Sequence, residues 1–168
     1  IARIAVTRPD KLNALNRAVL SELAVAVREV SRQGGPRVAV LTGEGGRAFV
    51  AGADIAEMSD LSTAEAKAFS DAGHLVCALI EQASCPFIAA VHGFALGGGC
   101  ELALACDFII ASDRARFCAV FGRIGLVPDL GGFFLLPRIV GLQRAKELVF
   151  SAREIDADEA MRLGIAFM

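Results

Sequence analysis

Tryptophan and tyrosine are both absent from the 168 residues, so the chain lacks the two side chains on which nucleobases most often stack. It also has no excess of basic charge, because 17 Lys and Arg stand against 19 Asp and Glu, and no basic run occurs. Binding to nucleic acid depends largely on neutralising phosphates with basic side chains. These absences argue against a nucleic-acid partner.

Histidine is scarce as well, with only His74 and His92, and the five cysteines form no C-x-x-C pair. Such a set offers little for a zinc site or for a serine triad, and no metal is expected. The cysteines lie in apolar surroundings and are odd in number. We expect reduced core thiols and a cytoplasmic protein.

No long apolar run is free of charge, although 55% of the residues are hydrophobic and the mean hydropathy is +0.54. The most apolar stretch, 86–111, is interrupted by His92, Glu101 and Asp107. A membrane-spanning helix needs about 20 mostly apolar residues, so this stretch is expected to be buried core. Ile1 begins strand-like sequence without a basic leader, and no signal peptide is expected.

The patterns that remain indicate one α/β domain over residues 1–168, since buried strands alternate with amphipathic helices. Asn16 is a plausible N-cap, and Ser62 with Glu65 forms a capping box. Strands are expected at 1–7, 38–41, 86–91 and 107–111. Helices are expected at 16–33, 62–83, 98–106 and 156–163, with weaker signals after Pro128 and Gly141.

The clearest local motif is the glycine-rich segment 93–101. It is not a dinucleotide fingerprint, because Leu102 stands where glycine is needed, and Gly99 replaces the lysine of a phosphate-binding loop. A strand, three glycines and a helix carrying Glu101 would suit an anion, or an oxyanion formed during reaction. Tight packing of strand on helix is an equally good explanation of the glycines. A second glycine turn, 51–54, could supply another N–H or be an ordinary turn.

Four blocks, in this order, resemble the crotonase (enoyl-CoA hydratase/isomerase) superfamily: 8–16, 49–55, 92–103 and 125–132. The resemblance implies a spiral of β-β-α units. It also implies that a C-terminal helical segment, which covers the active site and helps to build trimers in relatives, is absent from a chain that is partial at both ends. The expected assembly is a homotrimer or a dimer of trimers.

The resemblance further implies an acyl-CoA substrate whose thioester oxygen binds between the amides of Ala53 and Gly98. Coenzyme A belongs to the substrate, so no separate cofactor is expected. The residues expected to bind substrate or CoA are Lys11, Asn13, Ala14, Leu15, Ala51, Asp54, Ile55, Ala56, Gly97 and Phe121.

Glu101 matches the first of the two glutamates used by hydratases of the family, but Phe121 stands at the second position. Asp129 stands where some members of the family have a catalytic aspartate, so Glu101 and Asp129 are the candidate acid/base pair. The alternative for Asp129 is a helix N-cap after Pro128.

This pairing favours double-bond isomerisation over hydration. The alternative function is a catalytically silent acyl-CoA-binding or scaffold protein. Phe133 stands where the family often has threonine, and with Phe134 it is expected either to enlarge an apolar acyl pocket or to fill the core.

Overall fold

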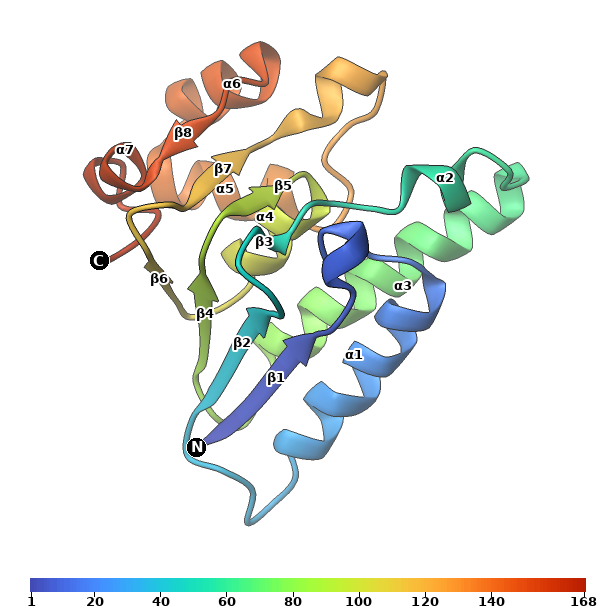
Figure 1. The fold of residues 1–168 in the computed structure, drawn as a ribbon, viewed down its shortest axis with the longest axis vertical. Helices are drawn as coiled ribbons and strands as arrows, with labels where there is room; N and C mark the ends of the chain where they lie inside the picture. The colour runs from blue at the N-terminus through green and yellow to red at the C-terminus, as the bar shows by residue number, and fades with distance from the viewer.

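The strands form two four-stranded sheets in the computed structural model, which describes residues 1–168 (Figure 1). The first sheet is entirely parallel and has the order β1 (Ala2–Val6), β2 (Ala39–Gly43), β4 (Phe87–Val91), β6 (Phe108–Ala111). The second has the order β3 (Ala48–Val50), β5 (Phe94–Leu96), β7 (Arg116–Cys118), β8 (Ile155–Asp156). Only β8 is antiparallel to its neighbour.

The chain passes repeatedly from the first sheet to the second: β2 leads to β3, β4 to β5, and β6 to β7. Helical segments follow these strand pairs, which confirms the expected spiral of β-β-α units. The helices are α1 (Arg17–Val30), α2 (Ile55–Met58), α3 (Thr63–Glu81), α4 (Gly98–Leu104), α5 (Gly132–Val140), α6 (Leu142–Ser151) and α7 (Ala157–Arg162). Short 3₁₀ turns span Pro9–Lys11 and Val120–Ile124.

Side-chain caps fix the helix starts that the sequence predicted. The Asn16 side chain accepts a hydrogen bond from the Val19 amide (2.9 Å), and both halves of the Ser62–Glu65 capping box are formed. The Asp156 side chain caps α7 by accepting from the Glu159 amide at 2.8 Å. The two long helices α1 and α3 pack side by side, and α1 also contacts β1.

Two of the glycines before and within α4 have different structural reasons. Gly97 has φ 50° and ψ −121°, a conformation that side-chain-bearing residues rarely adopt. A side chain on Gly99 would overlap the carbonyl of Val50, so this glycine lets α4 approach β3 closely. The packing explanation therefore holds for Gly99.

The core is one cluster of 39 buried residues, and it includes all five cysteines except Cys118, which is also buried. The expectation of buried free thiols is confirmed. Phe133 and Phe134 are instead 57% and 54% exposed on α5, so neither fills the core, and neither lines the cavity described below. No helix is both long and apolar enough to cross a bilayer.

Candidate active site

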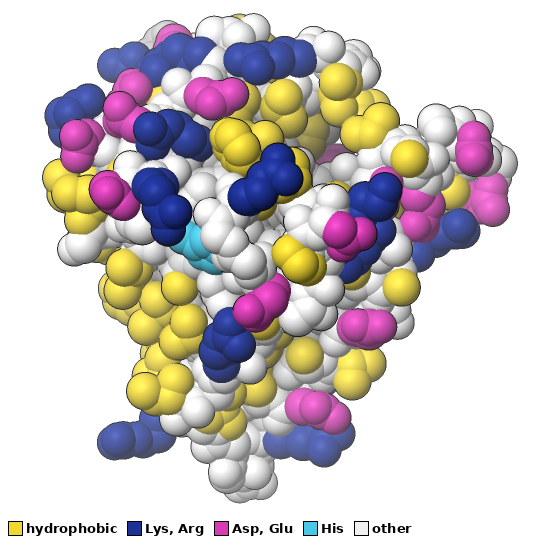
Figure 2. Space-filling model, in the orientation of Figure 1, with side chains coloured by type: hydrophobic (Ala, Val, Ile, Leu, Met, Phe, Trp, Pro, Cys, Tyr) yellow, Lys and Arg dark blue, Asp and Glu magenta, His cyan; other side chains and the backbone are white.

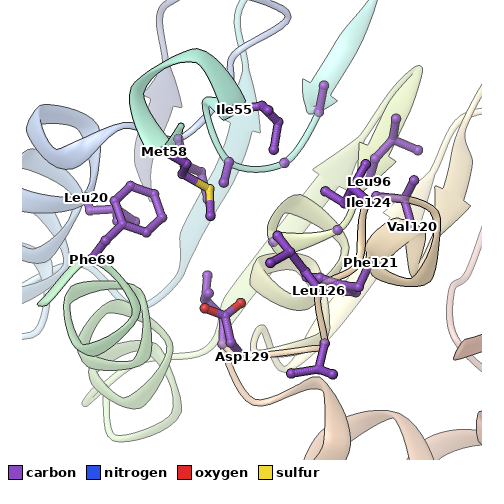
Figure 3. A pocket seen from close by; sticks show the side chains of 18 residues that line it. Leu20, Ile55, Met58, Phe69, Leu96, Val120, Phe121, Ile124, Leu126 and Asp129 are labelled. Atoms are coloured by element: carbon purple, nitrogen blue, oxygen red, sulfur yellow. The ribbon is translucent and has the colours of Figure 1, made fainter. Parts of the chain in front are cut away.

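A cavity of about 360 Å³ lies at the N-terminal end of α4. Leu20 and Phe69 from α1 and α3 and Met58 from α2 form one wall, and Phe121 and Leu126 lie opposite (Figure 3). The complete lining is Leu15, Leu20, Ala51, Gly52, Ala53, Ile55, Met58, Phe69, Leu96, Gly97, Gly98, Val120, Phe121, Ile124, Leu126, Val127, Asp129 and Leu130. Asp129 is the only lining residue with a polar side chain, so the cavity suits an apolar group carrying one reactive centre.

The backbone amides of Ala53 and Gly98, which both belong to this lining, have no acceptor within the protein. The short parallel bridge between Leu15 and Ala53 uses the N–H of Asp54 and the carbonyl of Gly52 and leaves the Ala53 N–H unused. Gly98 is the first residue of α4, and its N–H likewise has no partner. Both amides therefore remain able to bind an oxygen atom in the cavity.

An ion pair holds the segment that presents the Ala53 amide. The Arg8 guanidinium donates to the Asp54 carboxylate at 3.0 Å and to the Ala14 carbonyl at 2.7 Å. This hydrogen bond to Arg8 holds the pKa of Asp54 below its usual value. Arg8 thus joins the loop after β1 to the turn between β3 and α2.

The Asp129 carboxylate makes no hydrogen bond or ion pair within the protein, and it points into the cavity (Figure 3). Helix α5 begins three residues later at Gly132, with Gly131 at its N-cap and no side-chain cap. The N-cap interpretation of Asp129 is therefore wrong. A half-buried carboxylate without a partner is available to accept a proton from a bound molecule.

Glu101 is placed differently, since its side chain is buried behind the cavity at 2% exposure. Its carboxylate accepts hydrogen bonds from the Gly132 amide (2.7 Å) and from the Leu130 amide (3.2 Å to each oxygen). Burial raises the pKa of Glu101 to about 7, and the negative charge of Asp129 adds to that effect while the Gly132 amide opposes it. The two predicted acid/base residues are thus electrostatically coupled, but only Asp129 faces the cavity.

The predicted binding residues divide into two groups. Five of them line the cavity: Leu15, Ala51, Ile55, Gly97 and Phe121. Five lie outside it: Lys11, Asn13, Ala14, Asp54 and Ala56. Arg8 binds two members of the second group, Asp54 and the carbonyl of Ala14, which are the chain neighbours of the lining residues Ile55 and Leu15.

Asn13 shows what this support consists of. It is completely buried with φ 58°, and its side chain accepts from the Arg8 amide and donates to the carbonyls of Glu44 and Ala48. All of its hydrogen-bonding groups are used within the fold. The structure therefore gives Asn13 the task of tying the loop after β1 to β3.

Sequence reasoning missed much of the apolar wall, notably Leu20, Met58 and Phe69. Leu20 and Phe69 belong to the buried faces of predicted helices, and nothing in their spacing distinguishes a cavity wall from ordinary core. No group of three or more His, Cys, Asp or Glu side chains is placed to hold a metal ion.

The free amides of Ala53 and Gly98, together with the Asp129 carboxylate in an apolar cavity, are suited to a carbonyl compound that develops negative charge on oxygen. The family model described as enoyl-CoA hydratase/isomerase matches residues 1–168. The chain belongs to this family, and its fold is that of the crotonase superfamily.

Curated relatives agree with the family assignment. The chain is 47% identical over 165 residues to a crotonyl-CoA hydratase of Syntrophomonas wolfei, covering 98% of this chain and 64% of that protein. It is 44% identical over 165 residues to a short-chain-enoyl-CoA hydratase of Clostridium acetobutylicum, covering 98% and 63%. The chain thus spans slightly less than two thirds of the length of these curated relatives.

Solved structures show the same architecture. An enoyl-CoA hydratase from Bacillus anthracis superposes with a TM-score of 0.95 at 37% identity, covering 98% of this chain and 64% of the other. A putative enoyl-CoA hydratase from Thermobifida fusca, solved in complex with acetoacetyl-CoA, gives a TM-score of 0.88 at 35% identity, covering 98% and 68%.

Proposed function

We propose that the protein is an acyl-CoA-processing enzyme that shifts the double bond of an enoyl thioester. The observation that carries this proposal is that Asp129 is the only polar side chain in a cavity with two free amides. Family membership and the relative crystallised with acetoacetyl-CoA support a CoA thioester as the substrate.

The reaction follows from this arrangement. The thioester oxygen would accept hydrogen bonds from the Ala53 and Gly98 amides, and the Asp129 carboxylate would remove a proton from the α carbon of a 3-enoyl thioester. Negative charge then moves to the thioester oxygen, where the two amides stabilise it. Asp129 returns the same proton to the γ carbon, which yields the 2-enoyl thioester without any water or redox partner.

Hydration is the second candidate, because the curated relatives described above carry the names of hydratases. In this chain, Phe121 stands at the second glutamate position of family hydratases and lines the cavity. An aromatic side chain cannot activate water, so a hydratase would have to rely on the remaining carboxylates. Isomerisation needs only one of them.

The test is Asp129→Asn, assayed separately on 3-enoyl and 2-enoyl CoA thioesters. We expect isomerisation to fall by about 100-fold or more, since a general base contributes 10²–10⁴-fold. Asp113→Asn is the matched control, because Asp113 is an exposed carboxylate without an ion pair.

Two outcomes would redirect the proposal. If the wild type converts 2-enoyl thioesters to 3-hydroxy products and does not shift double bonds, the enzyme is a hydratase. If CoA thioesters raise the melting temperature but no product forms, the protein is the silent acyl-CoA-binding member of the fold.

A further inference from the structure

The Glu101 carboxylate is nearly sealed from the cavity in which Asp129 lies. Glu101 is only 2% exposed, and it borders a separate space of about 10 Å³. Gly97 and Phe121 line both this space and the main cavity, and so lie at the boundary between them. A space of that size is at the lower limit for one water molecule, which leaves no room for a reacting group next to Glu101.

All the strong contacts of Glu101 lead to the segment that carries Asp129. The amides of Leu130 and Gly132, on either side of Gly131, both donate to its carboxylate. Gly132 is required for this approach, since a β carbon there would lie 2.5 Å from Oε1 of Glu101. The Leu130 side chain is held from the other side, where it packs against Gly73 of α3.

We infer that Glu101 is a positioning residue, which anchors the segment 129–132 to α4 so that the Asp129 carboxylate faces the thioester. This inference rests on the proposed function, because it assigns the proton transfer to Asp129 alone. Glu101 and the Gly98 amide lie on the same short helix. The anchor therefore sets the distance between the base and one of the oxyanion donors.

Two substitutions of Glu101 separate anchoring from proton transfer. Glu101→Gln keeps the length of the side chain and one acceptor oxygen, but it cannot act as a base. Glu101→Asp keeps the carboxylate, but it withdraws the oxygens by about 1.5 Å, beyond hydrogen-bond distance of the amides. If Glu101 is an anchor, activity should survive Glu101→Gln better. If Glu101 is a base, activity should survive Glu101→Asp better.

We expect Glu101→Gln to keep a kcat about tenfold or more above that of Glu101→Asp, because only the former retains a hydrogen bond to the segment. KM should change little in either variant, since the apolar walls remain. The reverse order of kcat values would overturn the inference. Glu29→Gln and Glu29→Asp are the matched controls, since Glu29 is exposed on α1 and its side chain makes no hydrogen bond.

A measurement on the wild type covers the case in which either variant fails to fold. The Leu130 and Gly132 amide resonances should titrate together near neutral pH as Glu101 gains its proton. Asp129, Cys77 of α3 and Cys100 are the other titratable groups coupled to Glu101. Repeating the titration in Asp129→Asn assigns the transition, and a transition that moves only one of the two amides would overturn the inference, because both amides donate to the same carboxylate.

The two proposals fail in different ways. If Asp129→Asn retains full activity, the proposed function is wrong, whatever Glu101 does. If Asp129→Asn is inactive while Glu101→Asp exceeds Glu101→Gln, only the positioning role is wrong.

Discussion

At the scale of single residues, the site depends on glycines as much as on carboxylates. Gly132 allows an amide to reach Glu101, Gly97 supplies a turn with positive φ, and Gly73 leaves room for Leu130. A side chain at any of these positions would displace a residue that lines the cavity or borders it. The geometry of the site therefore depends partly on positions that carry no side chain.

Gly132→Ala tests this dependence directly. Its new methyl group would collide with the Glu101 carboxylate, so we expect a loss of about 1–3 kcal/mol in the free energy of unfolding, together with reduced kcat. Urea unfolding and steady-state kinetics measure the two effects. Gly46→Ala is the control, because a β carbon there meets no atom within 4 Å. Equal stability of the two variants would show that Glu101 can move without cost.

At the scale of elements, α4 is a short helix, entirely buried, that contributes the Gly98 amide at its start and Glu101 one turn later. The segment 52–54 contributes the other amide and is held by Leu15 and Arg8. Each donor thus belongs to a different β-β-α unit. Their spacing depends on how those units pack, and not on one loop.

Gly98→Pro removes one donor without removing the helix. Proline is favoured at the first helical position, where the N–H has no intrahelical partner. We expect kcat to fall by about 100- to 1000-fold, the usual effect of losing an oxyanion donor. Gly98→Ala keeps the N–H, and its β carbon would make only ordinary contacts, at 3.5 Å and 3.6 Å, with Leu130 and Leu15. Comparable activity of the two variants would contradict a role for this amide.

The Arg8–Asp54 ion pair should give the stability a particular pH dependence. Because the pKa of Asp54 is lowered in the folded state, its contribution is complete above the ordinary aspartate pKa and is lost as the pH falls through the folded pKa. Asp54→Asn should therefore cost about 1 kcal/mol at pH 7 and progressively less in acid. Urea unfolding at neutral and acidic pH, with Asp113→Asn as control, measures the difference. A cost independent of pH would exclude the ion pair as its source.

The sequence predicted the long elements and the residues that cap them, because Asn16, Ser62 and Glu65 act within one turn of their own helix. The three-residue strands β3, β5 and β7 were missed, since so short a segment shows no periodicity. The amides of Ala53 and Gly98 were predicted through family resemblance. The burial of Glu101 could not be predicted, because it depends on a segment about thirty residues further along the chain.

At the scale of the whole molecule, apolar surface remains on the outer face of β6, an edge strand of the first sheet. Phe108, Ile110 and Phe167 are each about half exposed or more, and Figure 2 shows hydrophobic side chains gathered there. The backbone of Phe167 pairs with β6, so this patch, consisting of these three residues, continues to the end of the chain. Exposed patches of this kind commonly mark interfaces.

We expect the protein to self-associate through this patch, in keeping with the predicted homotrimer or dimer of trimers. Ile110→Lys should shift the molecule to a smaller species in sedimentation velocity, because a charge opposes burial of the patch. Val25→Lys is the control, since Val25 is 52% exposed on α1, away from β6. If the wild type sediments as a monomer at all concentrations, the predicted assembly is wrong for this chain.

The alternation of the chain between two sheets also has a consequence for the order of folding. Ala2 pairs with Ala39, and Ala39 pairs in turn with Phe87. Strand pairings in the first sheet therefore join residues that lie far apart along the chain, and each closes a long loop. Pairings of this kind form slowly, because the entropy of loop closure is lost before the contacts are gained. Ala53, Gly98 and Asp129 come from three successive turns of the spiral. A chain released before its last turn is complete would lack both the base and the cavity wall that carries Phe121 and Leu126.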